Sequence, residues 1–496
     1  MSTDFSRRRF LAAALSGLVA TPALSGPPAA SLRPVLRGED LFKRSVPSVE
    51  DILGKARLEG LASFAVADAQ TGLRLETFAA QTARPPASVA KVLTALYALD
   101  ALGQDHRFET RLIATGGIVN GIVQGDLVLA GGGDPTLDTD RLAGMAERLR
   151  AAGVTGVKGS FRVYEEALPV LARIDAAQPD QVGYNPGISG LALNYNRVHF
   201  EWKRGGNGYD VTMEGRSERY RPAVRVAVMR LEDRAAPVYT YEDRDGRDNW
   251  TVARPALGKS GARWLPVRKP GLYAAEVFSV LAGAEGIKLG TPELTASVPA
   301  GETVVTERSE ALRPLLKDML KWSTNLTAEM VGMAATQARG VRPDSLKASA
   351  EQMNDWARET LGMQSVALVD HSGLGDDSRL TAHDMVTALV RMQGTGLRDI
   401  LKPIALRDDQ RRIVRDHPVT VHAKTGTLNF VSALAGYMTA PDGTEMAFAI
   451  FTADEAIRAT ITREERERPA GGRAWIGRSK TAQQELIERW AVLYGA

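Results

Sequence analysis

The chain has 496 residues, of which 44% are hydrophobic and 24% charged, and this ordinary globular balance excludes a collagen, a disordered protein and a polytopic membrane protein. It has no cysteine and six scattered histidines, so disulfides, thiolate nucleophiles, cysteine-ligated metals and an H-E-x-x-H zinc site are excluded. The net charge of +3 falls to about +1 once the first 25 residues are left out, which gives no indication of nucleic-acid binding.

Residues 1–25 are predicted to be an export signal peptide. Arg7, Arg8 and Arg9 precede an apolar run from Phe10 to Ala20, and small residues follow it. The run is too short to cross a bilayer, which needs about 20 apolar residues. The paired arginines before Phe-Leu resemble a twin-arginine signal, so we expect export by that route, a periplasmic location and a mature protein with no stable membrane span.

After a flexible leader, the next segment predicts a strand pair and a helix. Alternating apolar residues on both sides of the turn at 70–72 predict a hairpin over 62–78. Pro85 and Pro86 end it. A helix is then expected from Ser88, with apolar positions repeating at helical spacing, to its stop at Gly103.

The middle of the chain differs from both of its ends. Residues 107–306 are rich in short strand-like pieces and turn residues. Helices are expected again over 312–337, 343–361 and 381–393, followed by strands around 419–421, 430–438 and 446–451 and a final helix over 481–493. We therefore predict one catalytic domain formed by 26–106 and 307–496 and interrupted by a β-rich inserted region, 107–306.

Three short motifs carry the chemistry. Ser88-Val89-Ala90-Lys91 is an S-x-x-K motif at a helix start, Ser323-Thr324-Asn325 is an S-x-N motif, and Lys424-Thr425-Gly426 is a K-T-G motif beside a predicted strand. Each motif alone is a weak signal, and Ser88 by itself could be a helix cap. In this order, each in its expected local structure, they form the signature set of the penicillin-recognising serine enzymes.

The chemistry of the first motif is physically reasonable. Residues three apart share a helix face, so the Lys91 amine can reach the Ser88 hydroxyl. Serine needs an adjacent base, and lysine serves as one only if burial or a second cation, for which Lys424 is a candidate, lowers its pKa from about 10.4. The helix N-terminus disfavours positive charge and offers N–H groups to an oxyanion.

The motif spacing and several longer stretches identify a family. Ser323 lies 235 residues after Ser88, and Lys424 lies 101 residues after Ser323, so the first gap is much longer than in a class A β-lactamase. The chain resembles the class C low-molecular-mass penicillin-binding proteins, the D-alanyl-D-alanine carboxypeptidase/endopeptidase family. The stretches 85–109, 125–137, 190–198 and 424–437 carry this resemblance. Two stretches depart from it: residues 370–375 read D-H-S-G-L-G where the family more often has D-G-S-G-L-S, and residues 401–422, before Lys424, are short and lack the usual Gly-Thr-Leu element.

The resemblance implies a mixed α/β (α+β) fold: a penicillin-binding, serine β-lactamase-like transpeptidase domain with an antiparallel sheet and helices, split by the β-rich insertion. It also implies a role for each motif residue. Ser88 would be the acylated nucleophile, Lys91 its base and Ser323 a proton relay, while Asn325, Lys424, Thr425, Gly426 and Thr427 would bind substrate. The N–H groups of Ser88 and Thr427 would form the oxyanion hole.

By the same resemblance the substrate is a D-Ala-D-Ala end or a D-Ala cross-link of peptidoglycan stem peptides, and β-lactam antibiotics are covalent inhibitors acting at Ser88. No metal or cofactor is implied, and no nucleic acid. Two alternatives stay open at this point: a serine β-lactamase, and a catalytically silent penicillin-binding scaffold. The sequence does not choose between carboxypeptidase and endopeptidase activity, since both would use one site.

Overall fold

The computed structural model describes residues 46–408 and 410–495. By its contacts the chain divides at Val46, and Pro47–Ala496 is the second of its two units. The predicted signal peptide, residues 1–25, lies outside the described residues. Every described helix and strand belongs to the second unit.

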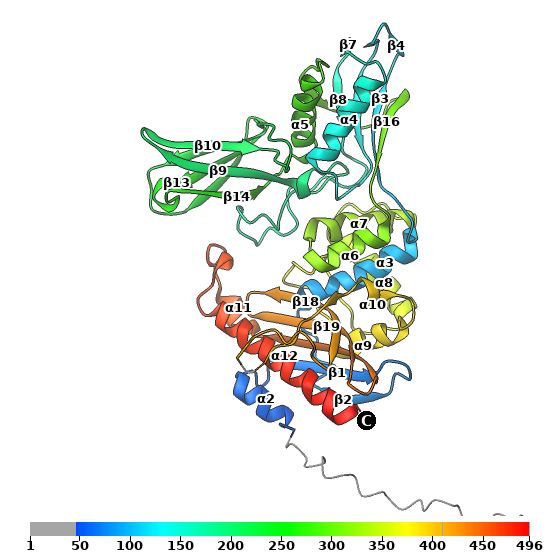
Figure 1. Ribbon diagram of the computed structural model, residues 1–496, viewed down its shortest axis with the longest axis vertical. Helices are drawn as coiled ribbons and strands as arrows, with labels where there is room; N and C mark the ends of the chain where they lie inside the picture. Colours follow the sequence, from blue (N-terminus) through cyan, green and yellow to red (C-terminus); the bar gives the residue numbers. More distant parts are fainter. Residues whose placement is uncertain (1–45, 409, 496) are drawn as a thin grey trace, which may run out of the picture. The chain divides into compact units, whose positions relative to one another are not determined.

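A six-stranded antiparallel sheet joins the two ends of this unit (Figure 1). Its order is β17-β18-β19-β20-β1-β2, so strands from the start of the unit pair with strands from its end. The strands are β1 (Ala62–Asp68), β2 (Arg74–Phe78), β17 (Lys402–Pro403), β18 (Thr420–Leu428), β19 (Val431–Thr439) and β20 (Glu445–Ala453). The hairpin expected over 62–78 and the strands expected around 430–438 and 446–451 are confirmed.

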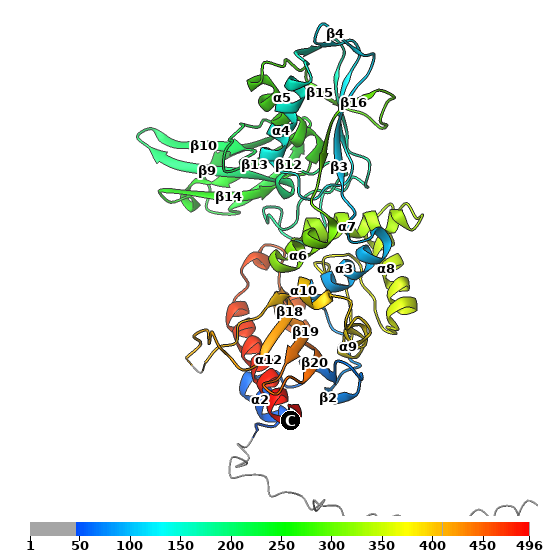
Figure 2. The same cartoon turned by 45° about the vertical axis from the view of Figure 1, so that its right-hand side comes forward.

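Helices cover both faces of this sheet, as Figures 1 and 2 show from two sides. One face packs on α2 (Val49–Ala56) and α12 (Gly472–Tyr494). The other packs on a helical layer whose members are α3 (Ala90–Leu102), α6 (Leu312–Trp322), α7 (Asn325–Ala338), α8 (Leu346–Leu361), α9 (Ala382–Arg391) and α10 (Leu397–Ile400). Because both faces are covered, the central strands read as nearly continuous apolar runs: β1, β19 and β20 are buried along almost their whole length.

The chain leaves this layered body after α3 and returns at α6 through two neighbouring strands. β3 (Glu109–Ala114) pairs antiparallel with β16 (Glu302–Arg308), and the Ser309 N–H donates to the Phe108 carbonyl at 2.9 Å. We call residues 109–308, between these points, the middle region. It has its own hydrophobic core.

The middle region contains four sheets. A five-stranded sheet has the order β15-β8-β6-β3-β16, and three three-stranded sheets have the orders β10-β9-β14, β11-β13-β12 and β4-β5-β7. The remaining strands are β4 (Ile118–Val119), β5 (Ile122–Val123), β6 (Leu127–Gly131), β7 (Gly156–Val157), β8 (Phe161–Tyr164), β9 (Arg197–Gly205), β10 (Gly208–Glu214), β11 (Ala227–Glu232), β12 (Tyr239–Arg244), β13 (Arg247–Ala253), β14 (Ser260–Pro266) and β15 (Pro292–Leu294).

The middle region also contains two long helices, α4 (Thr139–Ala151) and α5 (Pro270–Ala284), which bury one side each in its core. Two sequence expectations about helices were wrong. The helix expected over 312–337 is two helices, because Ser323 adopts the left-handed conformation, φ 59° and ψ 40°, and ends α6. The last helix begins at Gly472 rather than at 481, since its first turns are already anchored by the buried Trp475.

Short helical pieces complete the unit: the 3-10 turns η2 (Ala87–Val89), η3 (Asn194–Asn196), η4 (Arg254–Ala256) and η5 (Glu465–Glu467), and the short helix α11 (Glu455–Thr460). In residues 46–408 and 410–495, none of the helices combines the length and the apolar character that crossing a membrane requires. The same residues hold no cluster of three or more metal-ligating side chains.

Candidate active site

Ser88 lies in a 3-10 turn at the start of the helical layer. The helix expected to begin at Ser88 starts with the 3-10 turn η2, which contains Ser88 and leads directly into the regular α-helix α3. Ala87 has a positive φ of 47°, and Ser88 itself is half-buried. This places the Ser88 hydroxyl between α3, which carries its neighbour Lys91, and the exposed side of β18.

Strand β18 passes unusually close to this turn, and Gly426 makes the approach possible. A Cβ atom at Gly426 would lie 2.7 Å from the Pro86 carbonyl oxygen and 3.0 Å from the Ser88 nitrogen. No side chain fits there. The glycine of the K-T-G motif is therefore required by the distance between the strand and the turn that holds Ser88.

Lys91 connects the first two motifs. Its buried Nζ lies 3.0 Å from Ser88 Oγ and donates to Asn325 Oδ1 at 2.8 Å and to the Ser372 carbonyl oxygen at 2.7 Å. The amine is thus held one turn from the hydroxyl by two acceptors from other parts of the chain.

Burial lowers the pKa of Lys91 to about 8, and the nearby carboxyl groups of Glu329 and Asp370 oppose this shift. The charge of Lys424, the second cation suggested by the sequence, does not contribute to this lowering of the Lys91 pKa. Burial also raises the pKa of Glu329 to about 8, and the charge of Asp370 acts in the same direction. A substantial fraction of Lys91 is therefore neutral near pH 8, as a general base requires.

Ser323 and Asn325 lie on either side of the break between α6 and α7. The left-handed Ser323 turns its Oγ toward Lys424, whose Nζ donates to it at 2.9 Å. Asn325, the first residue of α7, accepts from Lys91 and donates its Nδ2 to the Tyr184 carbonyl oxygen at 3.0 Å. On the continuous helix that the sequence predicted, residues 323 and 325 would not share a face, so the break lets both side chains reach the site.

Lys424 is almost fully buried on β18. Its Nζ also donates to the Thr425 carbonyl oxygen at 2.7 Å. Burial lowers the pKa of Lys424 well below its ordinary value, and the charges of Lys91 and Lys402 act in the same direction. Thr425 and Thr427 alternate with buried Lys424 and Gly426 along the strand and are exposed on its open side.

The group that positions the Lys91 acceptor was not predicted from the sequence. Glu329, fully buried, accepts the N–H groups of His371 at 3.0 Å and Ser372 at 2.9 Å. It thereby fixes the peptide whose Ser372 carbonyl receives Lys91. Its spacing gave a usable signal, since Glu329 lies four residues after Asn325 on the same helix and therefore on the same face.

His371, the residue at which the stretch 370–375 first departs from the family pattern, is accommodated in a buried space. The imidazole is fully buried, and its Nε2 lies 2.8 Å from Ser349 Oγ. A Cβ atom at Gly332 would lie within 2.2 to 2.5 Å of the ring, so that glycine makes the room. Burial lowers the pKa of His371 to about 3. The neutral ring packs behind the site and stabilises the loop 370–373.

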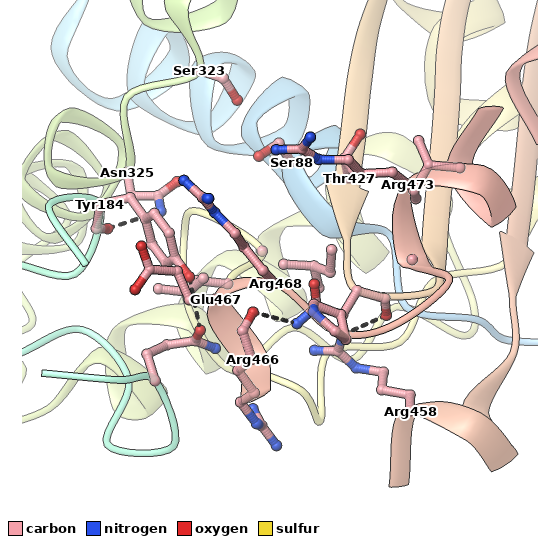
Figure 3. A pocket seen from close by; sticks show the side chains of 18 of the residues that line it. Ser88, Tyr184, Ser323, Asn325, Thr427, Arg458, Arg466, Glu467, Arg468 and Arg473 are labelled. Atoms are coloured by element: carbon pink, nitrogen blue, oxygen red, sulfur yellow. Dashed lines mark hydrogen bonds between the residues drawn. The ribbon is translucent and has the colours of Figure 1, made fainter. Parts of the chain in front are cut away.

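A cavity of about 920 Å³ opens onto these groups (Figure 3). Ser88, Ser323, Asn325 and Thr427 line its inner end. Its outer walls come from Gln178 and Tyr184 of the middle region and from residues 458–476. A volume of this size admits several residues of a peptide. Residues of the first two motifs, and Thr427 directly after the third, thus line a single open cavity. Behind it, the buried Lys91 amine is hydrogen-bonded to Ser88 and Asn325, and the Lys424 amine to Ser323.

A family model describes most of this chain. Residues 46–468 match the model of the D-Ala-D-Ala carboxypeptidase 3 (S13) family.

Individual relatives are distant but extensive. The chain is 28% identical over 438 residues to a D-alanyl-D-alanine carboxypeptidase of Actinomadura sp. (strain R39), covering 81% of this chain and 79% of the relative. It is 27% identical over 412 residues to carboxypeptidase DacB of Mycolicibacterium smegmatis, covering 79% and 76%. The crystal structure of penicillin binding protein 4 (dacB) from Haemophilus influenzae shares the fold, with a TM-score of 0.69 at 21% identity over 90% of this chain and 99% of that one.

Proposed function

Since the chain belongs to the D-Ala-D-Ala carboxypeptidase 3 (S13) family, we propose that it is a serine D,D-peptidase that cleaves D-Ala-D-Ala ends or D-Ala cross-links of peptidoglycan peptides through an acyl-enzyme on Ser88. The observation that carries the proposal is the Lys91 amine, buried and 3.0 Å from the Ser88 hydroxyl. A scaffold that only binds has no use for an amine held in this state beside a hydroxyl.

In the acylation step, Ser88 Oγ attacks the carbonyl carbon of the scissile D-Ala bond while its proton passes to neutral Lys91 Nζ. The N–H groups of Ser88 and Thr427 receive the developing oxyanion, an interaction typically worth about 2.7–4 kcal/mol per donor. The carbon–nitrogen bond then breaks, and the leaving amine takes the hydroxyl proton of Ser323, which the Lys424 ammonium replaces through its hydrogen bond to Ser323. In deacylation, water attacks the ester carbon and its proton passes back through Ser323 to Lys424. Lys91 returns its proton to Ser88 Oγ as the ester bond breaks.

Substrate binding is assigned to the remaining motif residues. Asn325 contacts a substrate amide, and Lys424, Thr425 and Gly426 hold the terminal carboxylate of the leaving D-Ala. The exposed Thr425 and Thr427 side chains on the open side of β18 support this assignment. β-Lactams acylate Ser88 in the same way because they mimic the D-Ala-D-Ala bond. The relatives' names refer to carboxypeptidases.

We further propose that the chain acts in the periplasm after export, with residues 1–25 as a signal of the twin-arginine type and 107–306 as a domain inserted into the catalytic domain formed by 26–106 and 307–496. The order of charged, apolar and small residues in 1–25 supports export. The separate core of the middle region and its two-strand connection support the insertion.

The deciding experiment is labelling with a fluorescent penicillin followed by mass spectrometry of the adduct. The wild type is expected to form a stable ester on Ser88. Ser88→Ala is expected to form none, and Lys91→Ala is expected to lose at least 10²-fold in acylation rate, the usual contribution of a general base. An adduct on another residue would refute the assignment, and rapid release of hydrolysed penicillin would identify a β-lactamase instead.

A further inference from the structure

The outer wall of the cavity is formed by a loop rich in arginine. We call residues 463–473, which connect α11 to the start of α12, the arginine loop. Four arginines line the cavity: Arg458 just before this loop, and Arg466, Arg468 and Arg473 within it (Figure 3). None of them belongs to the three motifs.

Two of these arginines are occupied within the protein. Arg458 and Arg466 both form ion pairs with Asp376, and Arg458 also donates to the Asn429 carbonyl oxygen at 2.8 Å. One carboxylate therefore serves two guanidinium groups, and a positive charge is left over. The only carboxylate among the lining residues, Glu467, is itself paired with Arg263 at 3.0 Å.

Arg468 and Arg473 are different. Both are exposed, and among the described residues neither side chain has a hydrogen-bond or ion-pair partner. In Figure 3 both side chains extend over the cavity, Arg468 in the direction of Asn325 and Arg473 in the direction of Ser88. The cavity thus has two unpaired guanidinium groups on the wall it shares with Ser88 and, within the described residues, no unpaired carboxylate on that wall.

We infer that Arg468 and Arg473 form a binding site for carboxylate groups on the acyl half of the substrate, so that the enzyme selects peptides that carry a free carboxylate upstream of the scissile bond. The inference rests on the proposed function and adds to it the charge of the preferred substrate.

The direction of β18 determines which half of the substrate meets the arginines. Lys424 and Thr425, proposed to hold the terminal carboxylate of the leaving D-Ala, come first along the strand. Thr427, Leu428 and Asn429 follow and line the cavity. Each strand residue advances about 3.3 Å. The cavity therefore extends away from the leaving-group end, and the acyl half occupies the part that the arginine loop encloses.

The chemistry favours a carboxylate over other ligands. The planar guanidinium matches a carboxylate with two parallel hydrogen bonds, which gives geometric selection as well as attraction. The positive end of the α12 dipole, which begins at Gly472, acts in the same direction as a minor contribution. Because both arginines are exposed, each interaction is modest and screened by salt, and a combined selectivity of about tenfold is the reasonable expectation.

The test uses two synthetic peptides ending in D-Ala-D-Ala that differ at one group: a γ-linked D-glutamate in the acyl half with either a free α-carboxylate or an α-carboxamide. The kcat/KM for D-Ala release is measured for both. The wild type is expected to prefer the free carboxylate by about tenfold, and less so as salt rises. The double variant Arg468→Gln/Arg473→Gln is expected to have a ratio near 1, and Arg468→Lys/Arg473→Lys an intermediate one.

Arg391→Gln is the matched control, since Arg391 lies on α9, outside the cavity lining; it is expected to keep the wild-type ratio. Circular dichroism shows whether each variant is folded. If the double variant does not fold, the kcat/KM ratio is measured for the two single variants instead. A wild-type ratio near 1, or a ratio that survives the glutamine substitutions, overturns the inference. In that case penicillin labelling of Ser88 still upholds the proposed function, whereas absence of both labelling and D-Ala release overturns the two together.

Discussion

At the scale of single residues, the central feature is the amine of Lys91, which is buried away from solvent. Lys91 has no exposed surface, and every hydrogen-bond partner of its Nζ can accept: Ser88, Asn325 and the Ser372 carbonyl. Burial penalises the charged form, while Glu329 and Asp370 favour it. The balance leaves an amine that is protonated at neutral pH but loses its proton readily.

This balance predicts the pH dependence of acylation. In the proposed mechanism the base is the neutral amine, so the acylation rate is expected to rise with pH and to level off above the apparent pKa of about 8, which belongs to Lys91 and Glu329 together. Lys91→Arg is expected to remove the rise, because a guanidinium does not lose its proton in this range. The pH dependence of both proteins is measured by stopped-flow acylation with a chromogenic cephalosporin between about pH 6 and 9.5.

The unfolding transition recorded over the same pH range serves as the control, because it shows that the folded fraction stays constant. A rate that is flat, or that falls as pH rises through the apparent pKa, would contradict the role of Lys91 as base.

At the scale of elements, the site depends on three interruptions of regular structure. The 3-10 turn η2 precedes α3, the left-handed Ser323 separates α6 from α7, and the loop 370–375 is folded around the Asp370 carboxylate, which accepts the N–H groups of Gly373 and Gly375 at 2.6 Å each. Strand β18 closes the arrangement from the other side. Each interruption directs a polar group into the site. A continuous helix or strand would place apolar side chains in the same space.

The contact between β18 and η2 gives a prediction at this scale. Gly426→Ala would place a methyl group 2.7 Å from the Pro86 carbonyl oxygen, so the strand must move away from Ser88. We expect acylation by labelled penicillin to fall at least about 10²-fold, since small displacements of a reacting group are costly. The free energy of unfolding is expected to fall by about 1–3 kcal/mol.

Gly477→Ala is the matched control for this substitution. Gly477 lies inside α12, and a Cβ atom there would meet nothing within 4 Å. It is expected to leave acylation unchanged and to raise stability by up to about 1 kcal/mol through helix propensity. Wild-type acylation in Gly426→Ala would mean that the close approach is not needed for catalysis.

At the scale of the whole described unit, the middle region and the six-stranded body contact each other at several points beside the cavity, among them the Glu467–Arg263 ion pair of the arginine loop at 3.0 Å. Leu168, Ile188 and Ala192 pack against Leu326 and Met330 of α7. In addition, Asp180 pairs with Arg463 of the arginine loop at 2.8 Å. The loop that carries Arg468 and Arg473 is therefore attached to the middle region, and this attachment keeps the outer end of the cavity in shape.

Asp180→Asn tests this attachment. Burial acts to raise the pKa of Asp180, but Arg463 and Arg173 outweigh it and the net pKa is lowered. A lowered carboxyl pKa contributes stability above the unfolded value of about 3.9 and loses it as pH falls through the folded value. At neutral pH we expect the variant to lose about 1 kcal/mol at most and to exchange amide hydrogens faster in residues 461–471.

Asp233→Asn provides the comparison, because Asp233 forms an ion pair with Arg254 at 2.6 Å but its side chain is 80% exposed. It is expected to change neither stability nor exchange in the arginine loop. Unchanged exchange in Asp180→Asn would show that the loop holds its position without this ion pair.

The sequence by itself determined the chemistry of this protein and the order of its main elements. The S-x-x-K spacing is a helical repeat, and the hairpins and most helices follow from local periodicity and turn residues, which are properties of neighbouring positions. Only the tertiary structure decided that Ser323 breaks a helix, that Glu329 holds the Ser372 peptide toward Lys91, and that two arginines about 380 residues after Ser88 line the same cavity. These depend on burial and on contacts between distant segments, for which no local pattern carries the information.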